Sequence, residues 1–181
     1  YQKAIEMDPG SVESHFNLGS VYADLERKRE AIEEFRKAIE IDPSYAMAYF
    51  NLGVIYLEDR PEEAQANLRR ALSLDGDNVE IQYYLGKLYL RKGMYETAVR
   101  YLQNCREKDP DSPQVLYALG KAYNASDMPD QSIAALTRLV ELEPKNPDAY
   151  FNLGIAYDKK GLYDQAKYAY READRLMQQQ D

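Results

Sequence analysis

The sequence predicts an all-α fold in which antiparallel helix pairs stack into a solenoid, because three features recur together. The first is a leucine-glycine pair with a tyrosine three residues after the glycine, and it occurs five times. The glycines are separated by 34, 33, 34 and 34 residues, and they are Gly19, Gly53, Gly86, Gly120 and Gly154. The second feature is a stripe of small residues in each interval between these glycines, and the third is a helix breaker in each interval. Such a period is typical of stacked repeats and not of one globular core.

Each interval divides into two amphipathic stretches, which we call helix A and helix B. In the first repeat, helix A is expected from Val12 to about Leu25 and helix B from about Lys28 to Ile41. A breaker with proline or glycine follows helix B in each of the first four repeats, and another lies at residues 8–10. Proline cannot continue a helix, so these breakers mark helix ends. Four residues are expected to cap the N-termini of A helices, two of them directly before a proline: Ser11, Asn78, Ser112 and Asn146.

These limits divide the chain into one continuous array. Five repeats are expected at residues 12–45, 46–78, 79–112, 113–146 and 147–178, and residues 1–9 match the second half of a preceding helix B. The second repeat is one residue short in the turn at 58–61. The last repeat carries Lys167 and Asp174 where the first has Ile32 and Ile39. A polar outer face suits a terminal cap, so the array is expected to end near Met177 and to extend N-terminally in the parent chain.

Helix B carries small, large and small residues at i, i+4 and i+7, which lie on one side of a helix. In the first repeat they are Ala31, Phe35 and Ala38, and in the third they end at Cys105. The glycine of helix A also needs a packing reason, because glycine inside a helix costs about 1 kcal/mol. Both features predict a close approach between the two helices of a repeat.

The combined pattern resembles the tetratricopeptide repeat (TPR) family over nearly the whole chain. The 34-residue period with Leu-Gly, Tyr, Ala, Phe and Pro positions carries this resemblance. It implies a right-handed α-α superhelix and a function in protein–protein interaction. One departure is that the usual turn glycine between the helices is present only as Gly93 and Gly161.

At 100° per residue, the side of helix A opposite the leucine-tyrosine stripe can be located from the glycine. The resemblance implies that this side lines a concave groove for a peptide or a partner helix. Three residues before the glycine the side chain is always aromatic. The candidate groove residues outside the basic spot are Phe16, Asn17, Phe50, Asn51, Tyr83, Tyr84, Tyr117, Phe151 and Asn152.

Two interpretations stay open for each part of this set. The asparagines resemble the asparagine ladder of some TPR proteins, whose carboxamides hold a peptide backbone, but asparagine before Leu-Gly can also simply be common in the family. Tyr84 and Ala118 interrupt the ladder. The aromatic side chains are expected to pack against neighbouring helices, with apolar anchoring of a partner as the alternative.

A basic spot on the same side consists of Lys87, Arg91 and Lys121. Acidic side chains precede it in the chain, namely Glu13, Asp24 and Glu58. We hypothesise that the acidic segment of a bound peptide meets the basic spot. The alternative is an ordinary solvated helix face.

Composition excludes several classes of function. The formal net charge is −8 and the pI about 4.8, which disfavours nucleic acid as a partner. No apolar stretch is long enough to span a membrane. His15 and Cys105 are the only residues of their types, so no metal site, cofactor site or catalytic pair is expected. Cys105 should be a buried thiol, His15 a packing residue, and the acidic pairs Glu33-Glu34 and Glu62-Glu63 should lie on exposed faces.

The sequence therefore predicts a non-enzymatic scaffold that binds a protein or peptide in the groove of the A helices. One alternative is the substrate-recognition region of a larger enzyme such as a glycosyltransferase. Another is self-association through residues 1–9. The compartment is undecided, with the cytoplasm favoured.

Overall fold

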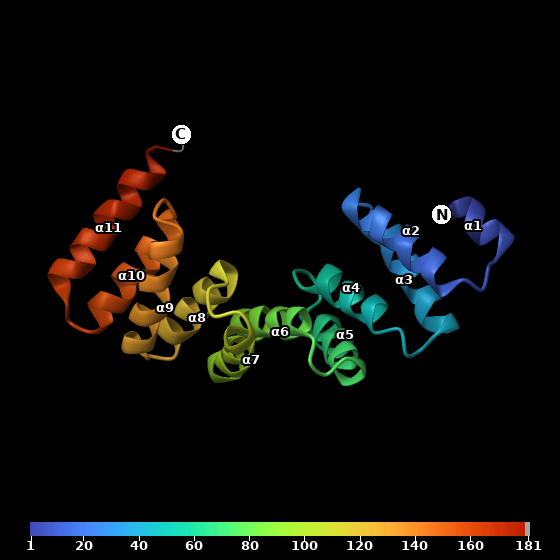
Figure 1. Cartoon of the computed structure of the whole chain (residues 1–181), viewed down its shortest axis with the longest axis horizontal. Helices are drawn as coiled ribbons and strands as arrows, with labels where there is room; N and C mark the ends of the chain where they lie inside the picture. Colours follow the sequence, from blue (N-terminus) through green and yellow to red (C-terminus); the bar gives the residue numbers. More distant parts are fainter. Residues whose placement is uncertain (180–181) are drawn as a thin grey trace. The chain divides into compact units, whose positions relative to one another are not determined.

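The computed structural model describes residues 1–179, apart from the side chain of Gln2, and this part of the chain holds eleven helices and no strand (Figure 1). The A helices are α2 (Val12–Asp24), α4 (Ala46–Tyr56), α6 (Val79–Arg91), α8 (Pro113–Ala125) and α10 (Pro147–Lys159). The B helices are α3 (Lys28–Ile41), α5 (Pro61–Leu74), α7 (Tyr95–Lys108), α9 (Pro129–Leu142) and α11 (Tyr163–Met177), and a short α1 (Gln2–Met7) precedes them. The all-α prediction is confirmed.

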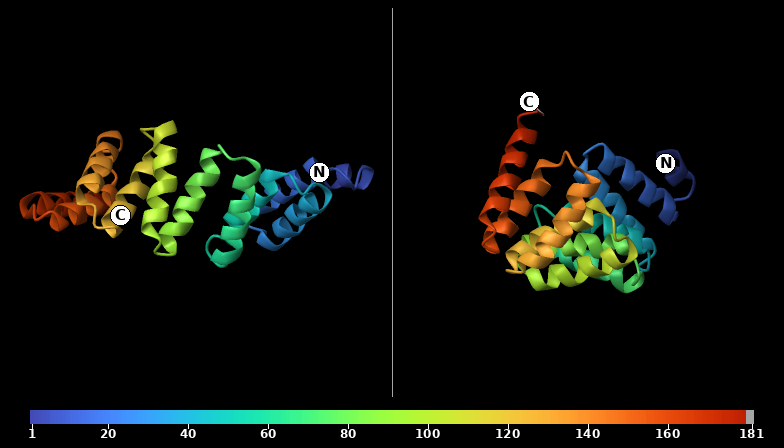
Figure 2. Two further views of the ribbon diagram at one scale, coloured as in Figure 1. Left: turned by 90° about the horizontal axis from the view of Figure 1, so that it is seen from below. Right: turned by 60° about the vertical axis from the view of Figure 1, so that its left-hand side comes forward.

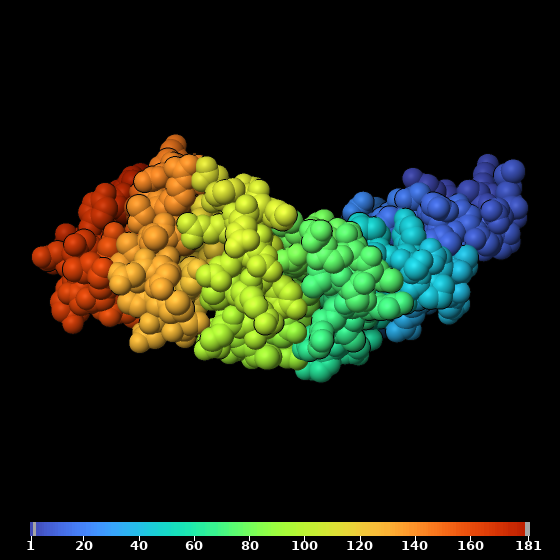
Figure 3. Space-filling model, turned by 60° about the horizontal axis from the view of Figure 1, so that its bottom comes forward, coloured from blue at the N-terminus to red at the C-terminus, as the bar shows by residue number. Residues whose placement is uncertain are grey.

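The helices form two compact units, one from Tyr1 to Leu88 and one from Tyr89 onward, so that α6 crosses the boundary. In the first unit α2 packs on α3, α3 on α4, and α4 on α5, while α1 contacts α2. In the second unit the same succession joins α7, α8, α9, α10 and α11, and α8 also contacts α10 directly. Figure 2 shows the antiparallel pairs within each unit, and Figure 3 shows consecutive segments of the second unit in contact along their surfaces.

The helix A glycines admit the large residue of helix B, as the sequence pattern predicts. A Cβ built on Gly19 would lie 2.8 Å from the Phe35 ring, and one on Gly120 would lie 2.5 Å from Leu136. Phe35 and Leu136 are fully buried at these contacts. The carbonyl oxygen of Gly120 also accepts a 2.9 Å hydrogen bond from the buried hydroxyl of Ser132. Gly19 and Gly120 therefore set the distance between the two helices of the first and the fourth repeat.

The N-caps of the A helices are confirmed at three of the four expected residues. The side-chain oxygen of Ser11 accepts from the amide of Ser14 at 3.2 Å. Asn78 and Asn146 accept in the same way from amides three residues ahead, at 3.1 Å and 3.0 Å. Ser112 occupies the N-cap position of α8, but its side chain makes no cap hydrogen bond.

Four turns between a helix A and its helix B contain a residue with positive φ, and this residue is glycine in two of them. Gly93 and Gly161 have φ of 71° and 76°, in the left-handed region that favours glycine. The equivalent residues two positions before α3 and α9 are Glu26 and Asp127, which adopt φ of 58° and 56°. The left-handed turn is thus kept in these two repeats, at a cost of about 1–2 kcal/mol for a side chain such as that of Glu26.

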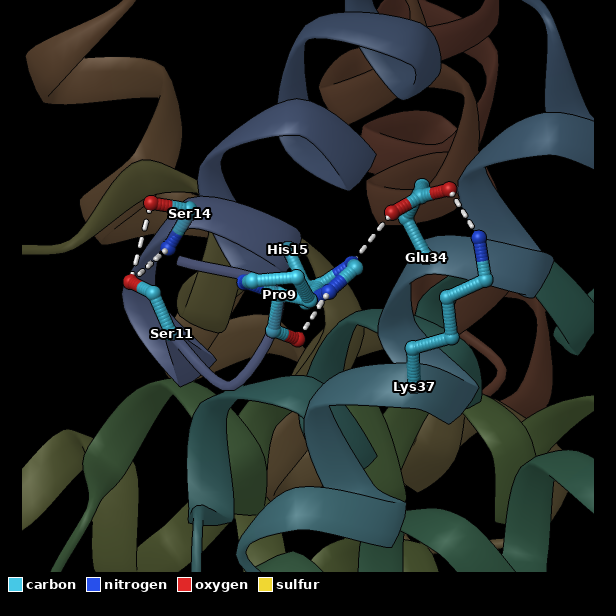
Figure 4. Close-up of polar contacts among 6 residues, drawn as sticks. All are labelled: Pro9, Ser11, Ser14, His15, Glu34 and Lys37. Carbon is cyan, nitrogen blue, oxygen red and sulfur yellow. Dashed lines mark hydrogen bonds and ion pairs between the residues drawn. The ribbon is translucent and has the colours of Figure 1, made fainter. Parts of the chain in front are cut away.

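The expectation that Glu34 lies on an exposed face is wrong, since only 8% of this residue is exposed. Its carboxylate accepts from Nζ of Lys37 at 2.8 Å, and its second oxygen lies 2.6 Å from Nδ1 of His15. Nε2 of His15 lies 3.2 Å from the carbonyl oxygen of Pro9 (Figure 4). The sequence placed His15 at an aromatic packing position, and the residue is indeed buried, but its role includes a polar connection between the loop before α2 and helix α3.

Candidate functional site

The aromatic row on the A helices of the first unit packs against neighbouring helices. The ring of Phe16 lies 5.7 Å from that of Phe35 on α3 and 5.2 Å from that of Tyr45, just before α4. The Phe50 ring lies 5.4 Å from that of Tyr84, and only 5% of Phe50 is exposed. These contacts favour the packing interpretation for Phe16 and Phe50.

A lysine lies over two tyrosine rings on α6. The rings of Tyr83 and Tyr84 meet edge to face at 5.6 Å, and Nζ of Lys87 lies 5.6 Å and 5.2 Å from their centroids. Cation–π contacts at such distances are attractive by about 0.5–1 kcal/mol at exposed sites. Arg91 follows one turn later on the same helix and is exposed. The half-buried Lys87 is therefore held against an aromatic surface.

The second unit repeats the lysine-tyrosine pair on α8. Nζ of the exposed Lys121 lies 5.4 Å from the centroid of the Tyr117 ring. Burial, together with the negative charge of Asp148 nearby, raises the pKa of Tyr117, which keeps its hydroxyl protonated. In both pairs the lysine follows the tyrosine by four residues, which is the spacing that brings side chains together on a helix.

Phe151 differs from the other aromatic residues of the row. It lies on α10, the last A helix of the described chain, and 46% of it is exposed. Its ring touches that of Tyr170 on α11 at 5.6 Å, in the same relation as Phe16 to Phe35. One side of Phe151 thus packs on helix B, and the remainder is an exposed apolar surface on the A-helix side.

The asparagine positions are not equivalent to one another. Asn51 is half-buried and donates one amide hydrogen to the Met47 carbonyl at 3.0 Å. Asn152 is only 9% exposed, and it donates to the Asp148 carbonyl at 2.8 Å. Asn17 is half-buried on α2. The bond of Asn51 uses one of its two amide hydrogens, so this carboxamide retains further hydrogen-bonding capacity, whereas the Asn152 side chain is also hydrogen-bonded to Tyr117.

Asn124 lies on the same side of its A helix as the candidate groove residues, but the sequence analysis did not predict a role for it. It lies four residues after Gly120, and its Nδ2 donates to the backbone carbonyl of Asn152 at 2.9 Å, joining α8 to α10. Only 7% of it is exposed, and its Oδ1 has no hydrogen-bond partner among the described residues. The corresponding residues in the other repeats are Ala23, Leu57, Leu90 and Asp158, so no periodic pattern indicated this role.

The acidic residues Glu13, Asp24 and Glu58 are exposed in the first unit. Over residues 1–179, no group of three or more His, Cys, Asp and Glu side chains is arranged to hold a metal ion. In the same part of the chain, no helix is both long enough and apolar enough to cross a bilayer.

The fold and its two helix faces define a helical repeat protein. Family comparison then gives the particular class: the tetratricopeptide repeat family matches residues 56–122 and 90–141 in one form, and 1–33 and 135–168 in another, while a TPR repeat form matches residues 21–59. The chain belongs to the TPR family. No curated protein matches it in sequence.

Solved structures show the same fold at low sequence identity. YrrB, described as a TPR protein with an unusual peptide-binding site, is 24% identical with a TM-score of 0.88, covering 97% of this chain and 91% of YrrB. MamA from Desulfovibrio magneticus RS-1 is 18% identical with a TM-score of 0.87, covering 94% and 97%. PilF from Pseudomonas aeruginosa is 24% identical with a TM-score of 0.76, covering 91% and 76%.

Proposed function

We propose that this chain is a protein–protein interaction scaffold whose A helices bind a peptide or a helical segment of a partner. The observation that carries the proposal is the surface of the second unit, where the half-exposed ring of Phe151 shares the A-helix side with the Lys121–Tyr117 pair. A large aromatic anchor beside a cation suits a segment that has both apolar and acidic residues. The similarity to YrrB, described as having a peptide-binding site, is consistent with this reading.

The lysine-tyrosine pairs give the proposed surface its charge preference. Lys87 and Lys121 are each held over a tyrosine ring, so less side-chain freedom is lost when a carboxylate binds them. Arg91 adds a further positive charge at the end of α6. We therefore expect each unit by itself to favour an acidic segment, the first unit at Tyr83, Tyr84 and Lys87 and the second unit at Tyr117 and Lys121.

The asparagines have different expected roles in this proposal. Asn17 and Asn51 are half-buried, so their carboxamides remain within reach of a bound backbone. Asn152 lies deeper, and its contribution is expected to come through the α8–α10 packing that Asn124 also supports. Phe16 and Phe50 are expected to support the binding surface by packing against neighbouring helices, without contacting the partner.

Peptides selected by phage display on the immobilised chain would test the proposal. Phe151→Ala should weaken the binding of selected peptides by at least about tenfold, which is the effect of losing about 1.4 kcal/mol. Tyr163→Ala is the matched control, because Tyr163 is an exposed aromatic residue, 72% accessible, on the B helix α11. Peptides that bind Phe151→Ala as well as the unchanged chain would contradict the proposed surface.

Self-association is a second candidate, and one observation favours it. Tyr1 and Met7 on either end of α1 are 60% and 88% exposed, which leaves apolar surface on this short helix. Sedimentation velocity over a range of concentrations distinguishes the two functions. A concentration-dependent dimer that Met7→Ser abolishes would support self-association, and a monomer at all concentrations would exclude it.

A further inference from the structure

Equivalent positions on three B helices differ in whether their side chain can reach a tyrosine of the following helix A. The position lies five residues after the first small residue of the helix B stripe, and it is Arg36 on α3, Gln103 on α7 and Thr137 on α9. Arg36 donates from Nη2 to the hydroxyl of Tyr56 on the following A helix at 3.2 Å. Gln103 donates in the same way to Tyr123 at 3.0 Å. A long donor side chain therefore connects helix B to the next tyrosine in both places.

Thr137 is too short to make this connection. The equivalent tyrosine is Tyr157 on α10, and no hydrogen bond to its hydroxyl is found within residues 1–179. Instead, Thr137 and Tyr157 line a pocket of about 520 Å³ bounded by α9, α10 and α11. Figure 1 shows these three helices in orange and red, and α10 contacts both of the others. The volume falls within the range of about 300–1,000 Å³ that ligand pockets occupy.

The lining of this pocket suits a cation. Tyr150 and Tyr168 join Tyr157, which gives three aromatic rings, and Glu141 and Asp164 supply two carboxylates. No lysine or arginine lines it. Aromatic faces and carboxylates both attract a cation, and a tyrosine oxygen can accept one of its hydrogen bonds. The acidic positions also recur in the first unit, where Glu40 and Glu62 are the equivalents of Glu141 and Asp164.

Two arginines on the helices that bound this pocket already have partners. Arg138 donates to both oxygens of Asp111 at 2.7 Å, and to Glu141 at 2.9 Å through its third nitrogen. The bond to Glu141 uses Oε2, and 57% of the Glu141 side chain is exposed. Arg175 on α11 donates from two nitrogens to Glu172 at 2.9 Å and 2.7 Å. Neither arginine donates a hydrogen bond to the hydroxyl of Tyr157, as Arg36 does to that of Tyr56.

We propose that the pocket bounded by α9, α10 and α11 receives an arginine side chain of a partner protein, whose guanidinium donates to the Tyr157 hydroxyl and lies against Glu141 and Asp164. Arginine is favoured over lysine because the chain itself places an arginine at the equivalent position in the first unit. Its planar fork of five N–H donors can also reach a hydroxyl and a carboxylate at the same time. This site lies on the B-helix side, so it is independent of the surface proposed for the A helices.

Titration of the ¹⁵N-labelled chain with Nα-acetyl-arginine amide tests the site. Chemical-shift changes should concentrate on amides of α9, α10 and α11. Nα-acetyl-citrulline amide has nearly the same shape without the charge, and it should bind at least about tenfold more weakly, since a charge-assisted hydrogen bond is lost. Nα-acetyl-lysine amide should also bind more weakly. Equal shifts with the citrulline probe, or shifts outside these helices, would overturn the proposal.

Two variants that exchange the side chains of the equivalent positions 36 and 137 test whether this position controls arginine binding. Thr137→Arg should fill the pocket from within and remove the arginine-dependent shifts, whereas unchanged shifts in this variant would overturn the proposal. Arg36→Thr should open the equivalent space and add a second set of shifts on α3, α4 and α5. Absence of that second set would overturn the equivalence on which the choice of arginine rests. Circular dichroism verifies that both variants are folded.

Discussion

Nδ1 of His15 lies 2.6 Å from Oε2 of Glu34, and this buried contact joins α2 to α3 in the first repeat. Burial disfavours the charged carboxylate, but hydrogen bonds from Lys37 and His15 outweigh this, so the pKa of Glu34 lies below its usual value. A carboxylate whose pKa is lowered by folding stabilises the folded state above its unfolded pKa. That contribution is lost as the pH falls through the folded pKa.

Glu34→Gln should therefore reduce the stability of the chain at about pH 7 by about 1–3 kcal/mol, because it weakens two hydrogen bonds to a charged group. The difference from the unchanged chain should diminish in acid, and it should disappear at a pH well below the ordinary glutamate pKa of about 4.3, where the carboxylate of the folded chain is protonated. Thermal unfolding followed by circular dichroism, at about pH 7 and at the acidic pH, measures this difference in stability. Glu33→Gln, on the exposed side of the same helix, is the control and should behave like the unchanged chain. A Glu34→Gln difference that persists in acid would show that its origin is not the carboxylate charge.

The two proline-initiated A helices of the second unit differ in their caps. Asn146 accepts from the Ala149 amide at 3.0 Å, whereas the side chain of Ser112 makes no cap hydrogen bond. Asn146→Ala should destabilise the chain by about 1 kcal/mol. Ser112→Ala should change stability by less than about 0.5 kcal/mol, because it removes no cap hydrogen bond. Urea unfolding of the two variants gives the comparison, and equal losses would mean that the cap bond does not decide their stability.

Overpacking at the helix A glycine should destabilise the fourth repeat. A methyl group on Gly120 would lie 2.5 Å from the buried Leu136 side chain, so the helices must move apart. The expected cost of overpacking is about 1–3 kcal/mol, which exceeds the helix-propensity gain of about 1 kcal/mol from glycine to alanine. Gly76→Ala is the control, because the nearest atom to its added methyl group is 3.8 Å away. Thermal unfolding should show a lower midpoint for Gly120→Ala alone.

Cys105 should react slowly with thiol reagents in the folded chain. The residue is fully buried, and burial raises the pKa of its thiol to about 11. At about pH 8 few molecules carry the reactive thiolate, and the reagent must wait for a local opening. Release of thionitrobenzoate from Ellman's reagent should be at least about tenfold faster in denaturing guanidinium chloride, where the ordinary pKa of about 8.5 returns. Equal rates in the two conditions would contradict the burial of this thiol.

The periodic sequence predicted the helices well, because each limit depends on local chemistry. Helix α3 begins and ends at the expected residues, Lys28 and Ile41, and the glycine contacts to Phe35 and Leu136 follow from one repeated pattern. The division into five repeats remains a prediction, since the structure shows helices and two compact units but does not test repeat boundaries.

The polar details could not be predicted in the same way. Glu34 is buried where it meets His15 of the neighbouring helix, and nothing in its local sequence distinguishes it from the exposed Glu33. Asn124 and Thr137 each occur once at their positions, so a search for repetition passes over them. For the groove residues, the sequence located the side of the helix, but the exposure of Phe151 against the burial of Phe50 required the neighbouring helices.

The central claim is that a partner binds on the A helices, and a backbone amide footprint tests it most directly. A phage-selected peptide would be added to the ¹⁵N-labelled chain, and shift changes would be mapped for the unchanged chain and for Lys87→Glu, Lys121→Glu. Lys108→Glu, Lys167→Glu is the control, because it makes the same change in charge on exposed B-helix residues. We predict a footprint on the A helices that includes α6 and α8, where Lys87 and Lys121 lie. The first pair of substitutions should weaken this footprint, and the control pair should leave it intact. A footprint confined to the B helices, or one indifferent to Lys87 and Lys121, would contradict the account.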